Sequence, residues 1–526
     1  MSIGIPLMPS AWQTNRWVHY FLGPSLVGAA ILSLLFTRLT FGPDAAGEGL
    51  ETLSSWHFSE QAFGLLNIRA DERGLAFLVI SLLLLLVVAL MTSPLYLRAD
   101  SNSGSLMTLA RRHWRIMSRW LLVGAGMCFL LVSANILTLG YAIIGFEAML
   151  VIYWLRRGQS NLAIGRLFLG ILTAAGFVLV ELSPNQGFMS GQDLLGLVLW
   201  LRLGVYPFIE VNQVKAWRAE EKLIYLGVTL IIGVYLMMRV TVAPLPQFVW
   251  WLAVVMMLIN GLLVWLSEDR QSQLTHLILT EILLLLLVVP LASGVGSAAG
   301  LALILSLIAL WVTPHLGRPN FTQTAWLWPY LPAATATLTL IGLPYSLGWL
   351  MRTEVYRLLL AADNLLLILM VFLAEILALS GLVRYWQTMW QVENGDNRRL
   401  AIGIAVMVPF LIPGLGPFIL DRMLRQTLPE VDLAHSSPVL VTLVVTILGA
   451  FGVTYFRVRL FEMLRIRPAR LTEWLQLQWL AELGVQGWTR FGKGILRLDV
   501  ILEGQYYIGW AIFVTLVGAL LIFLGA

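Results

Sequence analysis

Long apolar runs, separated by short polar stretches, recur from one end of the sequence to the other. Most of these runs have roughly the 17 to 25 residues that a helix needs to cross the hydrocarbon core of a bilayer. Apolar residues make up 59% of the 526 residues and charged residues only 12%, a balance that soluble proteins do not have. The sequence therefore predicts an all-α polytopic membrane protein, because helices satisfy every backbone polar group inside the hydrocarbon.

About fifteen runs are long enough to span the membrane. They lie near 19–37, 75–96, 118–135, 137–155, 163–182, 192–210, 222–239, 247–266, 274–294, 297–313, 326–360, 363–385, 400–420, 438–456 and 506–525. The loop 38–74 is acidic, whereas the loop 97–117 carries Arg98, Arg111, Arg112 and Arg115. Because positive loops stay in the cytoplasm, the second loop is expected there, and the N-terminus with it.

The segment 457–505 differs from the rest of the chain, since it mixes Leu and Trp with Arg at helical spacing. This pattern predicts an amphipathic segment, either on the cytoplasmic membrane surface or against a partner subunit. The net charge of +5 comes from the loops and is interpreted as topology, because no basic patch interleaved with aromatic residues points to nucleic acid.

Arg202 lies inside the apolar run 192–210, five residues before Pro207. A cation at this depth is tolerated only when it faces protein or water, so Arg202 needs a partner. Glu147, in the run 137–155, is the candidate. The two charges indicate either the beginning of an ion pathway or a buried structural pair.

The run 326–360 is too long for one span and is interrupted by Gly342-Leu343-Pro344 and Gly348. It predicts a broken helix, which is tolerated where the freed backbone groups meet protein or water. Arg352 follows four residues after Gly348. The break lines a transport path, or it is a packing kink whose arginine reaches the membrane surface.

Three further titratable residues lie in apolar runs and offer an alternative route for ions: His276, Glu281 and Glu375. His276 and Glu281 are five residues apart, so they do not share one face of a helix. His276 suits proton shuttling, but near the cytoplasmic end of its run a solvated histidine is the commoner case.

The sequence contains no Walker loop, Rossmann glycine fingerprint, His-Glu-x-x-His or Cys-x-x-Cys motif. Its one cysteine, Cys128, lies in an apolar run and is interpreted as a small buried apolar side chain. Disulfides, iron–sulfur clusters and cysteine-based zinc sites within the chain are thereby excluded. We expect no cofactor and no metal site, so any redox chemistry would belong to other subunits.

Four stretches, in order from about 147 to 354, resemble a known family. GFEAMLVIYWL, around Glu147, resembles the glutamate helix of the proton-translocating, antiporter-like membrane subunits of respiratory complex I, membrane-bound hydrogenases and multisubunit cation/proton antiporters. LRLGVYPF resembles the next signature, with Arg202 where the family has lysine. WLSEDRQSQLTHLILTEI resembles the Asp-x-Lys-Arg helix junction, with Asp269 retained, and LIGLPYSLGWLMRTEVY resembles the Gly-x-Pro break, with Arg352 at its charged position.

The resemblance implies two inverted repeats of five helices, each with a broken helix, in a multi-pass protein of the cell (inner) membrane. The implied parts are N-terminal helices with an outer acidic loop (1–117), a first repeat (118–239), a second repeat (247–385), C-terminal helices (400–456), the amphipathic segment (457–505) and a final transmembrane helix (506–526). Its implied partners are other membrane subunits of a complex, the lipid bilayer, and protons or monovalent cations. The chain itself would be a non-redox subunit of an NADH-quinone oxidoreductase-like or hydrogenase-like complex.

The chain departs from the family where proton movement is attributed to lysine. Arg202 and Arg352 replace two such groups, and Ile231 stands at the position that links the two halves. A buried lysine can release its proton, whereas a guanidinium keeps its own in any protein environment. The two half-pathways are therefore expected to be disconnected.

Two interpretations follow. In the first, the subunit moves protons: Glu147 accepts the proton, Arg202 sets its proton affinity, and Arg352 with Glu281 serves the second half. In the second, the chain is a degenerate paralogue that docks or braces a complex without conduction, with 457–505 as the contact. A stand-alone transporter of an organic solute is a third possibility, which a substrate-sized pocket at the midplane would indicate.

Overall fold

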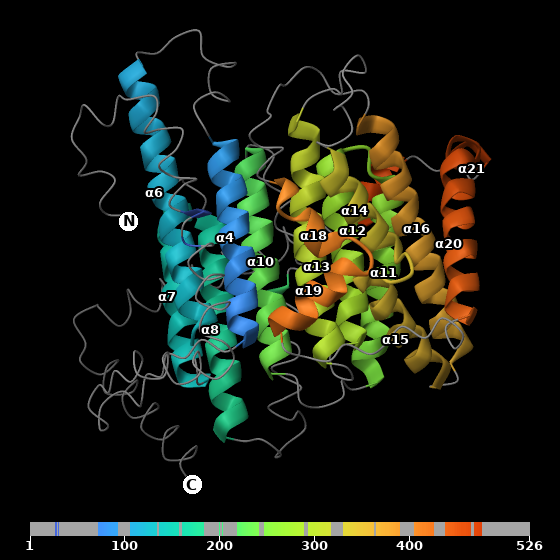
Figure 1. Ribbon diagram of the computed structural model, residues 1–526, viewed down its shortest axis with the longest axis horizontal. Helices are drawn as coiled ribbons and strands as arrows, with labels where there is room; N and C mark the ends of the chain where they lie inside the picture. The colour runs from blue at the N-terminus through green and yellow to red at the C-terminus, as the bar shows by residue number, and fades with distance from the viewer. Residues whose placement is uncertain are drawn as a thin grey trace, which may run out of the picture. The chain divides into compact units, whose positions relative to one another are not determined.

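The computed structural model describes residues 27–28, 30, 72–92, 106–133, 136–156, 160–182, 199, 202–203, 218–240, 247–288, 293–316, 330–361, 364–389, 404–424, 437–463 and 468–475. Every regular element in these ranges is a helix, which confirms the predicted all-α class (Figure 1). The helices are α4 (Glu72–Met91), α6 (Leu106–Leu131), α7 (Ile136–Leu155), α8 (Ser160–Leu182), α10 (Ala219–Val240), α11 (Gln247–Leu266), α12 (Arg270–Val288), α13 (Ser293–Val312), η3 (Thr313–Leu316), α14 (Leu331–Ile341), α15 (Leu347–Ala361), α16 (Leu365–Met389), α18 (Val408–Leu411), α19 (Leu415–Leu424), α20 (Ser437–Tyr455), α21 (Arg457–Met463) and α22 (Pro468–Leu475).

Five of the described helices are long and apolar enough to cross a membrane. These spans are Arg73–Met91, Thr138–Leu155, Ala219–Met238, Val295–Leu316 and Leu365–Thr388; α20 and α21 add a sixth if this pair, bent by 62°, is one span. The finding supports a multi-pass membrane protein. The count of fifteen spans and the inverted repeats stay predictions, since 506–525 and most of 19–37 and 192–210 lie outside the described residues.

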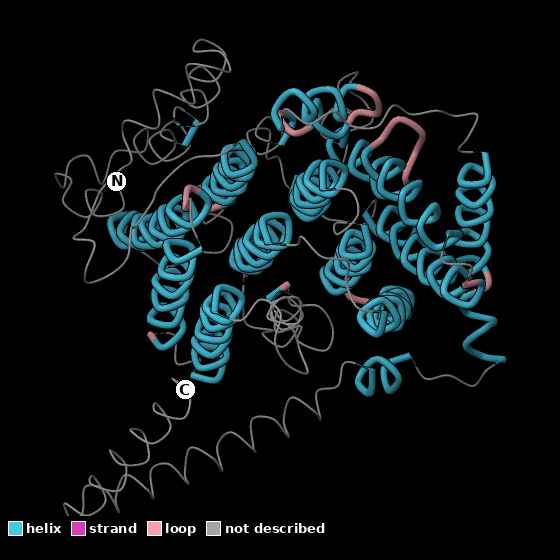
Figure 2. Tube along the Cα trace, turned by 90° about the horizontal axis from the view of Figure 1, so that it is seen from below, coloured by secondary structure: helices cyan, strands magenta, loops and turns pink. Residues whose placement is uncertain are grey.

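The core is centred on α13, whose membrane-spanning stretch is wholly buried. Its sequence, SGVGSAAGLALILSLIALWV, is apolar on every side, which is typical of a helix surrounded by other helices. It packs against α10 on one side and α12 on another, and α10 in turn packs against α4. The end-on view in Figure 2 shows these helices running roughly parallel through the bundle.

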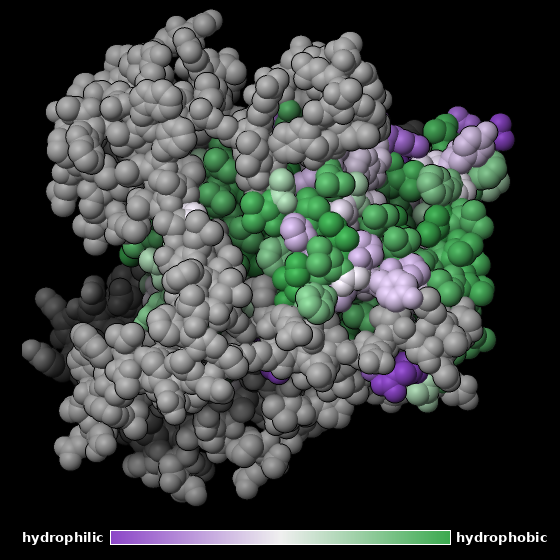
Figure 3. Space-filling model, viewed as in Figure 1, coloured by the Kyte–Doolittle hydropathy of each residue, from purple (hydrophilic) through white to green (hydrophobic). Residues whose placement is uncertain are grey.

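Apolar side chains also cover the outside of the bundle. Large apolar residues such as Ile152 of α7, Leu366 of α16 and Leu448 of α20 are more than half exposed. Figure 3 shows hydrophobic residues, in green, across most of the described surface on one face, with weakly hydrophilic residues in pale purple among them and the most hydrophilic ones, in deep purple, toward its upper and lower borders. Such a surface suits contact with lipid, because lipid tails are as apolar as these side chains.

One predicted boundary is wrong. The helix expected at 118–135 begins at Leu106 and ends at Leu131, so the arginines at 111, 112 and 115 lie in α6 and not in a loop. Arginine is a good helix former, and a charged stretch at the end of a span extends the helix without entering the hydrocarbon.

Two elements are broken by glycine and proline. The predicted break is confirmed: α14 ends at Ile341, Gly342 adopts a left-handed conformation (φ 79°), and α15 begins at Leu347. The run 400–420, expected to be one span, is also broken, between α18 and α19, where Gly414 has φ 80°. The correction follows from Pro413 and Pro417, which cannot donate backbone hydrogen bonds within a helix.

The two breaks are joined by hydrogen bonds. The Gly414 amide donates to the Tyr345 carbonyl at 2.7 Å, and the Thr339 hydroxyl donates to the Leu411 carbonyl at 3.0 Å. Tyr345 itself has φ 66°, which is uncommon for a residue other than glycine. The backbone groups that each break exposes are thus partly satisfied by the other break.

The chain divides into two compact units, Met1–Pro468 and Ala469–Ala526. The expected amphipathic segment 457–505 is described only over 457–463 and 468–475, where it forms α21 and α22. In the first unit, Arg457 of α21 donates to the carbonyls of Trp265 and Leu266, both at 3.2 Å. This places a cation on the carbonyl end of α11, where the helix dipole favours positive charge.

We predict that Gly414→Ala destabilises the protein by about 1–2 kcal/mol. Gly414 has a left-handed backbone conformation, which is unfavourable for alanine but not for glycine. The matched control is Gly452→Ala, at an open position inside α20, where alanine should be neutral or slightly stabilising. Thermal midpoints of the purified protein in detergent compare the two variants. Equal thermal midpoints of the two variants would show that the break between α18 and α19 does not require glycine at position 414.

Candidate functional site

Most of the buried charges gather in two clusters. The buried side chains of Asp, Glu, Lys and Arg among the described residues are Glu147, Arg166, Arg202, Glu221, Glu281, Arg352, Glu375 and Arg384. The first cluster consists of Glu147, Arg166 and Arg202, and the second consists of Glu281, Arg352 and Glu375. Both clusters include residues singled out in the sequence, but the structure divides those residues between two places.

In the first cluster, Arg202 Nη2 donates to Glu147 Oε1 at 2.5 Å. Arg166 of α8 approaches the same oxygen, with Nη1 at 3.8 Å. The Glu147 and Arg202 side chains are each at least 98% buried, so the pair lies inside the bundle and not toward lipid. Arg202 therefore has the partner that its position in an apolar run requires.

Sequence reasoning missed Arg166. Its Nε donates to the Tyr225 hydroxyl and its Nη2 to the Thr229 hydroxyl, both at 2.7 Å, so it connects α8 to α10. It lies near the start of its run, where an arginine ordinarily extends to the membrane surface. The short connection between α7 and α8 could have predicted this contact from the sequence. It makes the two helices antiparallel neighbours and brings Arg166 close to the level of Glu147.

The first cluster carries a net charge of +1, from one carboxylate and two guanidinium groups. Nε and Nη1 of Arg202 and Oε2 of Glu147 are buried without a hydrogen-bond partner among the described residues. Glu147 is the carboxylate that both guanidinium groups face among the described residues.

In the second cluster, one guanidinium binds two carboxylates. Arg352 Nη2 donates to Glu281 Oε1 of α12 at 2.7 Å, and Arg352 Nε lies 3.1 Å from Glu375 Oε1 of α16. The Tyr356 hydroxyl, one turn after Arg352, donates to Glu375 Oε2 at 2.9 Å. The three charged side chains are 97–98% buried, and their net charge is −1.

The break between α14 and α15 makes room for Arg352. A Cβ at Gly342 would lie 2.8 Å from Arg352 Cδ, and a Cβ at Gly348 would lie 1.8 Å from the Thr339 carbonyl oxygen. These glycines therefore let the arginine fold against the end of α14. The alternative that Arg352 extends to the membrane surface is wrong, since the residue is only 3% exposed.

His276 belongs to neither cluster. Its Nδ1 lies 3.0 Å from Asn260 Oδ1 of α11, and the residue is fully buried. The expectation of a solvated histidine is wrong, because Asn260, on the neighbouring helix, supplies a polar partner within the core.

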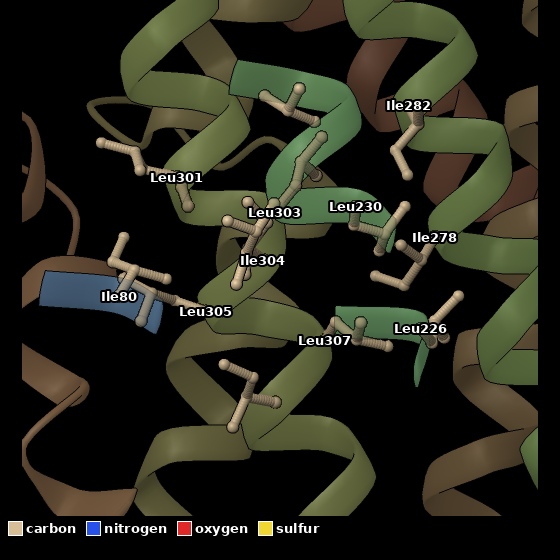
Figure 4. Packing of buried hydrophobic residues seen from close by; sticks show 14 of the residues in the cluster. Ile80, Leu226, Leu230, Ile278, Ile282, Leu301, Leu303, Ile304, Leu305 and Leu307 are labelled. Atoms are coloured by element: carbon tan, nitrogen blue, oxygen red, sulfur yellow. The ribbon is translucent and has the colours of Figure 1, made fainter. Parts of the chain in front are cut away.

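The region between the clusters is apolar. Thr229 of α10 accepts a hydrogen bond from Arg166 of the first cluster, and Glu281 of α12 belongs to the second. The residues that follow them in the sequence, Leu230 and Ile282, belong to one apolar core. Figure 4 shows Leu226 and Leu230 of α10 with Ile278 and Ile282 of α12 and Leu303 and Leu307 of α13, and we call these six residues the leucine layer. Ile231 is fully buried in the same core. The Ser306 hydroxyl of α13 is a polar exception, buried without a hydrogen-bond partner among the described residues.

No protein-family model and no curated protein matches the sequence. Among solved structures, a chain of the Mrp complex from Dietzia sp. DQ12-45-1b is similar, with a TM-score of 0.64 and 15% identity over 99% of this chain and 61% of that chain. A chain of the membrane-bound sulfane sulfur reductase, an archaeal respiratory membrane complex, is similar over 79% of this chain and 96% of that chain, with a TM-score of 0.53 and 11% identity.

The protein thus spans about 61% of the length of the first similar chain. At these identities the likeness concerns the fold, and at that level it confirms the resemblance to antiporter-like membrane subunits. Both similar chains come from membrane complexes.

The charge balance of the first cluster predicts how its variants rank in stability. Glu147→Gln leaves the buried Arg202 guanidinium without a carboxylate among the described residues and should lower the free energy of unfolding by about 3–5 kcal/mol. Arg202→Met should be milder, since Arg166 still faces Glu147. The double variant restores the wild-type net charge of +1 and should be more stable than Glu147→Gln alone. Thermal midpoints in detergent test the order; a double variant weaker than both single variants would contradict it.

Proposed function

We propose that the protein is an antiporter-like integral membrane subunit of a larger respiratory or ion-translocating complex and takes part in proton or cation/proton translocation. The observation that carries the proposal is the pair of buried charged clusters, one ahead of the helix junction at Asp269 and one after it, in a fold shared with chains of two complexes. Buried ionisable residues in a membrane-spanning bundle are costly and typically mark ion pathways.

Within each cluster, arginine and glutamate have different roles. The guanidinium groups of Arg166, Arg202 and Arg352 keep their protons, so they act as fixed positive charges. The carboxylates of Glu147, Glu281 and Glu375 can exist with or without a proton, so proton movement through this chain would use them. The buried setting strengthens every interaction between these charges, because the effective dielectric constant is low there.

A structural role without conduction is the second candidate, and the leucine layer favours it. A proton moves between titratable groups or ordered waters within hydrogen-bond reach, about 2.6–3.2 Å. The side chains of the leucine layer and of Ile231 provide no such group. In this case the chain would brace the complex, with 457–505 as a contact.

Proton flux distinguishes the two candidates. The complex, purified gently with its partners, is reconstituted in liposomes with an entrapped pH-sensitive dye. We expect proton flux in the wild type, and a loss of about tenfold or more in Arg202→Met and in Glu375→Gln, since removing a buried interaction of at least about 1.4 kcal/mol changes a rate tenfold. Both substitutions leave their clusters electrically neutral, so folding should survive.

The matched control is Arg357→Gln. Arg357 lies on α15 near Arg352, but it is exposed and pairs with Glu354, so flux should not change. Flux that persists in both cluster variants would refute the translocation proposal. An intact complex without flux, which loses its partners when 457–505 is deleted, would establish the structural role.

A further inference from the structure

The second cluster has one negative charge more than its contacts balance. Glu281 and Glu375 both bind Arg352, which supplies a single positive charge. An uncompensated charge costs several kcal/mol inside a low-dielectric bundle, so a third component is needed to neutralise it. The first cluster has the opposite balance, since Glu147 is faced by two guanidinium groups.

The helices packed against this cluster supply no second cation among the described residues. α11 and α13 carry no titratable side chain, and α20 carries only Tyr455. The remaining titratable residues of α12, α15 and α16 have other contacts: Arg270 donates to the Thr388 carbonyl, His276 contacts Asn260, Arg357 pairs with Glu354, Arg384 donates to the carbonyls of Trp265 and Ser267, and the Tyr385 hydroxyl donates to the Leu310 carbonyl.

Two carboxylate oxygens of the cluster, Glu375 Oε1 and Glu281 Oε2, are buried without a hydrogen-bond partner among the described residues. Glu375 Oε1 still lies 3.1 Å from Arg352 Nε in an ion pair, and Glu375 Oε2 accepts a hydrogen bond from the Tyr356 hydroxyl. Glu281 uses Oε1 for Arg352, while its Oε2 is buried without a hydrogen-bond partner among the described residues. A bare carboxylate oxygen in this position is unfavourable, whereas a protonated one carries no charge.

We propose that the second cluster binds one exchangeable proton, held on Glu281 Oε2. Binding forms one O–H bond with a proton delivered by hydronium, which leaves as water, and the cluster changes from a net charge of −1 to zero. The proposal rests on the proposed function, because it names where a translocated proton would bind.

Infrared spectroscopy of the purified full-length chain in lipid nanodiscs tests the proposal. A protonated carboxyl group has a C=O stretching band that shifts in D₂O and is absent from a carboxylate. We expect this band at neutral pH in the wild type and in Glu147→Gln, and its loss in Glu281→Gln. We also expect its loss in Glu375→Gln, although Glu281 is still present, because removing one carboxylate lets Glu281 ionise as the single partner of Arg352.

Glu354→Gln is the matched control, since this glutamate pairs with Arg357 outside the cluster and its removal should not change the band. Three results would overturn the proposal: no band in the wild type, a band lost in Glu147→Gln but kept in Glu281→Gln, or a band that added Na⁺ abolishes, which would assign the site to a metal cation. Proton flux without the band would refute this site alone, whereas the band without flux would refute translocation alone.

Discussion

The arrangement of the bundle depends on neutralising guanidinium groups inside an apolar environment. Arg202 and Arg352 occupy segments that the hydrophobic pattern assigns to the membrane, and each is at most 3% exposed. Neither can lose its charge, so the surrounding helices must bring carboxylates to them. α7 does so with Glu147, and α12 and α16 do so with Glu281 and Glu375. The helix contacts in each half are thereby constrained by a few ion pairs within an otherwise non-directional core.

The two clusters show how similar residue types give different chemistry. In the first cluster, one carboxylate faces two arginines, and it is the carboxylate that Arg202 contacts among the described residues. Two carboxylates on one arginine form a site that gains from accepting a positive charge. The number of each residue type, more than its identity, therefore sets the charge balance of each cluster. This balance also accounts for the expected difference between Glu147→Gln and Glu375→Gln.

Much of the architecture could be predicted from the sequence, because long apolar runs and glycine–proline breaks act locally. The helical class and the break beside Arg352 were predictable in this way. The break between α18 and α19 was missed, although Pro413 and Pro417 indicate it, because the apolar character of the run outweighed them. Arg166 was missed because its partners come from α7 and α10, and the periodicity of one helix does not predict its contacts with other helices. The burial of His276 depends likewise on Asn260, sixteen residues earlier on another helix.

The leucine layer has an electrical consequence. It lies between a region of net positive charge and a region of net negative charge, and its hydrocarbon screens electric fields far less than water does. The charges of the two regions therefore interact electrostatically across the apolar side chains of α10, α12 and α13. A change of charge on Glu281 would alter the potential at Glu147 and Arg202 even if nothing passed between them. The two clusters would therefore be coupled electrostatically whether or not protons cross the leucine layer.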